Sequence, residues 1–95
     1  MAALMIVVTK VLKSEGWEPY QSRVGDCFAG YGGKYVVKRE TPVVLEGRFE
    51  KERITIFEFP SMQAIQDLWG SDEYREIRKL RDGLGELDVL AVQTV

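Results

Sequence analysis

The chain has 95 residues, of which 45% are hydrophobic and 29% charged, and this composition indicates one globular domain over residues 1–95. Thirteen basic and fifteen acidic residues leave a net charge of −2, so the chain lacks the positive excess that binding to nucleic acid requires. It has no histidine and a single cysteine, which removes the main ligands of zinc, non-haem iron and His-ligated haem sites and all histidine-based catalysis. We therefore expect no metal site and no cofactor.

The first predicted element is a strand over residues 4–11. Its sequence, LMIVVTKV, is a continuous apolar run rich in β-branched residues, which is typical of a central strand covered on both faces. The run is too short to cross a bilayer, and no basic segment precedes it as in a signal peptide. We expect no membrane partner and a cytoplasmic protein.

An amphipathic helix is predicted over residues 17–31, because apolar residues recur there at steps of three and four. Pro19 is tolerated only in the first turn, which places the cap near Gly16, although Ser14 is the better capping residue type. The glycine-rich segment 30–33 then ends the helix.

Residues 34–39 and 43–46 are interpreted as one long strand interrupted near Pro42, because proline cannot donate a hydrogen bond to a sheet. For the same reason we place this strand at an edge of the sheet. Residues 47–51 are predicted to form a polar turn, and residues 53–59 the returning strand of an antiparallel hairpin.

Two short helices and a last strand complete the chain. Ser61 is predicted to cap the first helix, which ends at Gly70, and Ser71 to cap the second, whose first turn is acidic. The β-branched segment 87–95 follows a Gly-Leu-Gly break and predicts a strand. The element order is therefore β-α-β-β-α-α-β.

This order indicates the α+β class and the ferredoxin-like fold, βαββαβ with a split second helix, in which one antiparallel sheet carries its helices on one face. Strands that are apolar on both faces leave the other face of the sheet to be covered. A second copy of the chain, related by a two-fold axis, is the simplest cover. We therefore expect a homodimer.

Several sequence blocks in a fixed order resemble a known family. They are Tyr31-Gly-Gly-Lys-Tyr-Val-Val, Val44-Leu-Glu-Gly, Phe57-Glu-Phe-Pro-Ser, and Trp69-Gly-Ser-Asp-Glu-Tyr followed by Leu80-Arg81. Over about residues 15–95 the chain resembles the domain-of-unknown-function family thirteen-thirty, a branch of the dimeric α+β barrels. The resemblance implies a ferredoxin-like homodimer that pairs as a dimeric α+β barrel. The chain departs from the family at Lys38-Arg39-Glu40-Thr41, where an Arg-Gly-Gly type bend is usual.

Glu58 is the candidate catalytic residue. It alternates with two isoleucines on an apolar strand face, where a carboxylate must be paired or have a raised pKa. It would serve there as a general base or hold a polar ligand. The alternative is a structural ion pair with Lys10, Lys38 or Arg39.

Five further residues are candidate ligand-binding residues. Trp69 and Tyr74 lie at the break between the two short helices, where their rings either line a pocket or pack in the core. Tyr35 follows the Gly-Gly turn and has the same two interpretations. Arg39 can bind a carboxylate with its guanidinium group, or pair with a protein acid. Arg81 belongs to the family pattern, and its alternative is a solvated, charged helix face.

Two functions remain open from the sequence. The first is a homodimer that binds a small molecule, with cofactor-independent catalysis on a small acidic or aromatic compound as its enzymatic form. The alternative is a non-catalytic module for dimerisation or interaction, which the absence of any recognisable catalytic motif favours. The superfamily of the resembled family contains both enzymes and ligand-binding proteins, so the fold does not choose between them.

Overall fold

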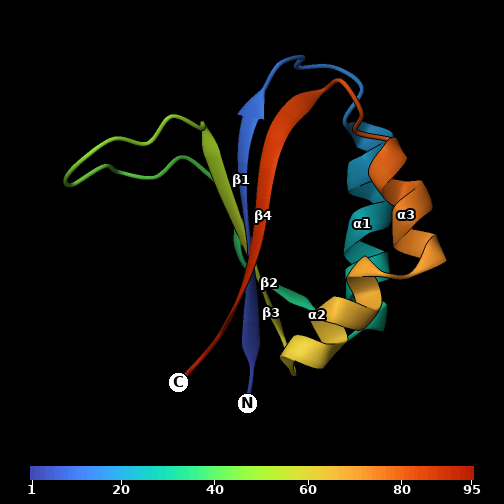
Figure 1. Ribbon diagram of the computed structural model, residues 1–95. Coiled ribbons are helices and arrows are strands. Elements are labelled where there is room, and N and C mark those ends of the chain that lie inside the picture. The colour runs from blue at the N-terminus through green and yellow to red at the C-terminus, as the bar shows by residue number, and fades with distance from the viewer.

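The computed structural model describes residues 1–95, and its helices and strands follow the predicted order (Figure 1). The elements are β1 (Ala3–Val11), α1 (Glu18–Gly30), β2 (Lys34–Glu40), β3 (Arg53–Phe59), α2 (Met62–Trp69), α3 (Asp72–Lys79) and β4 (Gly85–Gln93). The strands form one antiparallel sheet in the order β2-β3-β1-β4. All three helices cover the same face of the sheet (Figure 1). The predicted α+β, ferredoxin-like βαββαβ fold with a split second helix is confirmed.

The places of two strands within the sheet were predicted correctly. β1, the continuous apolar run, lies between β3 and β4, and β2 is an edge strand. Along β1, alternate side chains point toward the helices and away from them, as the period of two in a strand requires. We call the face toward the helices the inner face and the opposite one the outer face.

The predicted continuation of β2 over residues 43–46 is wrong. β2 ends at Glu40, and residues 41–52 form a long loop that extends away from the helices (Figure 1). The physical reason lies within β2, which pairs with β3 through two register shifts and turns at Arg39, whose φ is +50°. These irregularities take the chain off the sheet before residue 43. The segment 47–51 is therefore part of this loop and not a tight hairpin turn.

The helix caps agree with prediction for the two short helices. Ser61 Oγ accepts a hydrogen bond from the backbone N of Ala64, and Ser71 Oγ accepts one from that of Tyr74, each at 3.1 Å. The cap of α1 is Trp17, next to the predicted position near Gly16, and its side chain forms no capping hydrogen bond. Its indole Nε1 instead donates to the carbonyl oxygen of Lys13 at 2.6 Å, which fixes the ring at the start of the helix.

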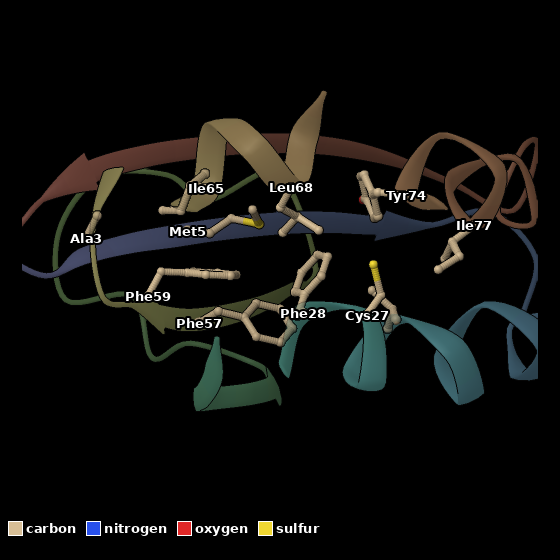
Figure 2. Packing of buried hydrophobic residues seen from close by; sticks show 11 residues of the cluster. Ala3, Met5, Cys27, Phe28, Phe57, Phe59, Ile65, Leu68, Tyr74 and Ile77 are labelled. Carbon is tan, nitrogen blue, oxygen red and sulfur yellow. The ribbon is translucent and has the colours of Figure 1, made fainter. Parts of the chain in front are cut away.

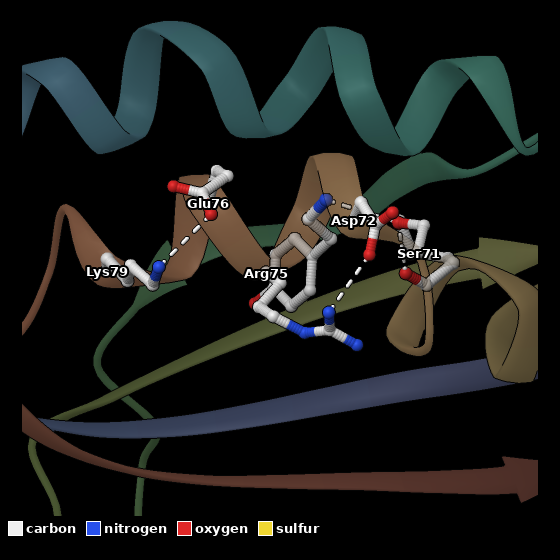
Figure 3. Close-up of polar contacts among 7 residues, drawn as sticks. Ser71, Asp72, Arg75, Glu76 and Lys79 are labelled. Atoms are coloured by element: carbon white, nitrogen blue, oxygen red, sulfur yellow. Dashed lines mark hydrogen bonds and ion pairs between the residues drawn. The ribbon is translucent and has the colours of Figure 1, made fainter.

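The exposed face of α3 carries charged side chains that pair within the helix (Figure 3). Arg75 bonds to Asp72 at 2.9 Å, and Lys79 bonds to Glu76 at 3.1 Å. Exposed pairs of this spacing contribute only about 0.3–0.5 kcal/mol each. This surface is the solvated helix face that the sequence predicted for the region, but Arg81 is not part of it.

The core lies between the inner face and the helices (Figure 2). Its fully buried residues are Ala3, Met5, Val24, Cys27, Phe28, Phe57, Phe59, Ile65, Leu68, Tyr74 and Ile77. Phe28 is at its centre, with ring centroids 4.6 Å from Phe57, 5.8 Å from Phe59 and 5.4 Å from Tyr74. Cys27 packs beside it as predicted, and burial raises the pKa of its thiol to about 12, with a further contribution from the Glu73 carboxylate.

The junction of α1 and β2 requires glycine at one position. A Cβ on Gly33 would lie 2.6 Å from ring atoms of Phe59 and 3.0 Å from the carbonyl oxygen of Phe28. A Cβ on Gly30, at the end of the same helix, would meet nothing within 4 Å. The two glycines therefore differ in packing although they lie three residues apart.

We expect Gly33→Ala to lower the free energy of unfolding by about 1–3 kcal/mol, because the methyl group forces Phe59 or the backbone to move. Gly30→Ala is the matched control, and it should be neutral or stabilising by up to about 1 kcal/mol. Urea denaturation of both variants measures the difference. Equal destabilisation by the two changes would contradict the close approach of Gly33 to Phe59.

Candidate functional site

A cavity of about 390 Å³ lies between α1 and the inner face of the sheet. Its volume falls in the range of small-molecule sites, which is about 300–1,000 Å³. It is lined mainly by apolar and aromatic side chains, among which a few polar groups are placed. It is the part of the helix–sheet interface that the core does not fill.

The cavity exists because the inward side chains become shorter along the sheet. At the core end, Met5 lies beside Phe57 on the neighbouring strand. Two residues further along β1, Val7 lies between Thr55 and Val89. These side chains do not extend far enough to meet α1, and a cavity is left above them.

Aromatic residues close the cavity on the side of the helices. Phe28 and Tyr74 line it and also belong to the core, so they separate the two regions. Trp17 and Tyr20, at the start of α1, line it further along, with their rings edge to face at 6.4 Å. Rings of this kind offer large apolar surfaces together with an N–H or O–H donor.

The edge of the cavity formed by β2 and β3 carries positive charge. Arg39 and Arg53 line it and are exposed, and neither forms an ion pair. Tyr35 lies beside them, with Lys38 Nζ 4.8 Å from the centre of its ring. Glu18 is the one acidic residue that lines the cavity. An anion that enters from this side therefore meets more positive than negative charge.

Arg39 has a strained backbone. Its φ of +50° makes it the one residue other than glycine with a positive φ, and its backbone N donates to Thr55 Oγ1 at 3.1 Å. The left-handed conformation costs a residue with a Cβ about 1–2 kcal/mol. Strain of this kind is common at functional sites, and here it coincides with the lining of the cavity.

Tyr20, Tyr74 and Arg81 form a polar cluster on the helix side of the cavity. The two phenol oxygens are 3.4 Å apart. The guanidinium carbon of Arg81 lies 5.7 Å from the centre of the Tyr20 ring, and its Nε is buried without a hydrogen-bond partner. Burial, followed by the influence of Tyr74, raises the pKa of Tyr20. Burial lowers the pKa of Arg81, but the nearby phenols of Tyr74 and Tyr20 raise it more.

The structure brings together four of the six predicted site residues. Tyr35, Arg39 and Tyr74 line the cavity, and Arg81 lies behind Tyr20. Trp69 does not reach the cavity. It is 37% exposed at the end of α2, between the ring of Tyr74 at 5.1 Å and the guanidinium of Arg78 at 5.2 Å, and it lines a second pocket between α2 and β4.

Glu58 lies on the outer face, away from the cavity. Its alternation with Ile54 and Ile56 is confirmed, but the helices cover the opposite face, which carries Phe57. Its ion-pair partner is Lys34, with Nζ 3.4 Å from Oε1, and none of the basic residues predicted for that role. A catalytic role for Glu58 thus has no support from contact with the other candidate residues.

Sequence reasoning missed most of the residues that line the cavity, among them Trp17, Tyr20, Arg53 and Thr55. Trp17 and Tyr20 belong to the same apolar helical stripe as core residues, so periodicity alone cannot distinguish a cavity wall from a packed interior. The polar atoms of these two side chains could have indicated a cavity wall, because a buried Tyr or Trp needs a hydrogen-bond partner.

No group of three or more Cys, Asp or Glu side chains is placed to hold a metal ion. None of the helices has the length and apolar character needed to cross a lipid bilayer.

Comparison with known proteins identifies relatives by sequence and by fold. The family described as Domain of unknown function (DUF1330) matches residues 2–95. A protein of unknown function from Rhodopseudomonas palustris has 20% sequence identity and a TM-score of 0.80, and the match covers 99% of this chain and 82% of that one. No curated protein matches the sequence.

Two further solved structures share the fold at lower identity. SnoaB, a cofactor-independent oxygenase from Streptomyces nogalater, has 12% identity and a TM-score of 0.70, with 99% of this chain and 93% of that one covered. A dimeric ferredoxin-like protein of unknown function from Jannaschia sp. CCS1 has 7% identity and a TM-score of 0.64, with 99% and 100% covered. The predicted family resemblance and the ferredoxin-like fold are thus confirmed.

We expect Arg39→Gly to raise the free energy of unfolding by about 1 kcal/mol, because glycine adopts a positive φ without steric cost. Arg39→Ala, which removes the same side chain but keeps the strain, should give no such increase. Chemical denaturation of the two variants makes the comparison. A gain in stability from alanine equal to that from glycine would show that the side chain, and not the backbone, is the source of strain.

Proposed function

We propose that this protein, which belongs to the family described as Domain of unknown function (DUF1330), is a homodimer that binds a small molecule in the cavity between α1 and the sheet. The cavity itself carries this proposal. A volume of about 390 Å³ is large for a chain of 95 residues and falls in the range of small-molecule sites. A ligand in this space would contact the apolar and aromatic side chains that line it.

The composition of the walls favours an acidic or aromatic ligand. The rings of Trp17, Tyr20 and Phe28 provide flat apolar surfaces, and Arg39 and Arg53 provide positive charge at one edge. The cofactor-independent oxygenase SnoaB has the same fold, which supports cofactor-independent catalysis as the enzymatic form of this function. The chain has no histidine, so the ionisable side chains that line the cavity are those of tyrosine, arginine and Glu18.

The outer face supports the proposed homodimer. No helix covers it, and β1 presents Leu4, Ile6 and Val8 there. On β4, Leu90 is 55% exposed and Val92 is 45% exposed. Together with Ile54 and Ile56 on β3, these residues would make a continuous apolar patch across three adjacent strands, and such patches mark association sites. Dimeric proteins among the structural neighbours are consistent with a second copy as the cover.

The alternative is a non-catalytic interaction module. The outer face favours it, together with the loop 41–52, where Val43 and Leu45 are 83% and 93% exposed. These surfaces serve association and make no use of the cavity. The two functions therefore differ in whether a small molecule enters the space beside α1.

We expect 2-methylnaphthalene, an apolar probe of suitable size, to bind in the cavity and to shift the methyl resonances of Val7, Val24 and Val89 in NMR spectra. Val7→Phe should weaken this binding at least tenfold, because the larger side chain occupies the space that the probe needs. Val36→Phe is the matched control, since Val36 is 55% exposed and does not line the cavity. Absence of binding to the unmodified protein would favour the interaction module.

We expect Leu90→Lys to shift the protein from dimer to monomer, because a charge on the outer face would be buried without a partner in the dimer. Leu12→Lys is the matched control, since Leu12 is 53% exposed but lies outside the sheet. Sedimentation equilibrium at micromolar concentration measures both. A monomeric unmodified protein would refute the proposed homodimer.

A further inference from the structure

We propose that the helix side of the cavity binds an anionic oxygen of the ligand, and that the ligand is an aromatic carboxylate held by Tyr20 and Tyr74 in front of Arg81. This inference rests on the proposed function, because it assigns a chemical class and an orientation to the molecule that the cavity holds. Its basis is a set of hydrogen-bond donors that lack an acceptor.

The two phenols leave at least one donor free. Each hydroxyl carries one hydrogen, so in the contact between Tyr20 and Tyr74 one hydroxyl donates and the other retains an unused O–H. Their separation of 3.4 Å is also well beyond the 2.7–2.8 Å that is usual for hydroxyl pairs. Both residues line the cavity, so we infer that an oxygen atom of a ligand reaches the pair of hydroxyls from that side.

Arg81 adds a positive charge that no protein acid neutralises. Its Nε is buried and has no partner, and the five ion pairs of the structure involve other residues. Buried polar atoms in proteins are almost always hydrogen-bonded, and this Nε lies behind Tyr20, which lines the cavity, so we infer that the ligand supplies an acceptor in its vicinity. A carboxylate supplies both the acceptor and the negative charge.

The surrounding charges favour an anion over a neutral acceptor. Two arginines and one glutamate line the cavity, and Arg81 lies next to it, whereas the chain as a whole has a net charge of −2. A phenol is protonated at neutral pH, and burial raises the pKa of Tyr20 further, so its hydroxyl is a donor. The rings around these groups match the flat, apolar remainder of an aromatic acid.

The edge of the cavity formed by β2 and β3, which we call the rim, is the competing binding place for the carboxylate. Arg39 and Arg53 also lack acidic partners, but both are exposed, and water weakens ion pairs at such positions. Tyr74 is buried and Arg81 is partly buried, so a carboxylate between them loses less of its attraction to screening. The structure therefore favours the helix side, and substitutions distinguish the two places.

The test compares 2-naphthoate with 2-methylnaphthalene, which have the same ring system and differ in the carboxylate. We expect the unmodified protein to bind 2-naphthoate at least tenfold more tightly in titrations followed by NMR. Tyr20→Phe and Arg81→Gln should each reduce the affinity for 2-naphthoate at least tenfold. Both should leave the affinity for 2-methylnaphthalene within about twofold, which also shows that the cavity has kept its shape.

Arg23→Gln on α1 is the charge-matched control, because Arg23 is exposed, forms no ion pair and does not line the cavity, and it should change the affinity for 2-naphthoate by less than threefold. If Arg53→Gln removes the preference for 2-naphthoate and Tyr20→Phe does not, the carboxylate binds at the rim and the inference is wrong. Equal affinities of the two probes for the unmodified protein would also overturn it, but would leave the proposed function standing. If neither probe binds, the proposed function fails and the inference fails with it.

Discussion

The arrangement of helices over the sheet depends on the packing of Phe28. Its ring contacts Phe57 and Phe59 on β3 and Tyr74 on α3, so one side chain of α1 fixes the helix against both the sheet and the second helical layer. Its backbone oxygen also accepts hydrogen bonds from the N atoms of Tyr31 and Gly33, which turns the chain into β2. On one side of this ring the interface is filled, and on the other it opens into the cavity.

Much of the fold could be predicted because local signals and burial agree. The run at residues 4–11 and the caps at Ser61 and Ser71 each depend on a few neighbouring residues, and they were predicted correctly. The segment 43–46 failed because its apolar character resembles a strand, whereas its conformation depends on the register of β2 against β3. Distant pairing of this kind leaves little trace in a single sequence.

The candidate site was harder to predict, for two physical reasons. The alternation along β3 correctly grouped Glu58 with Ile54 and Ile56, but it does not indicate which face the helices cover. The helices cover the opposite face, which carries Phe57 and Phe59. Tyr74 and Tyr35 were predicted as either pocket or core residues, and both interpretations hold in part, because each ring packs against another while it lines the cavity. Whether a cavity remains between the helices and the sheet depends on the sizes of all the side chains at the interface, so it cannot be predicted from single residues.

The two faces of the sheet allow ligand binding and association to be separate properties. Val7 and Val8 are neighbours on β1, yet the first lines the cavity and the second faces outward. A dimer formed through the outer face would therefore leave each cavity within its own subunit. β1 would be the structural link between the cavity and the dimer interface. Coupling between the two would require β1 to shift, which dense packing around Met5 opposes at the core end. At the other end, Val7 and Thr9 line the cavity, so this is the end of β1 through which a ligand would influence the partner subunit.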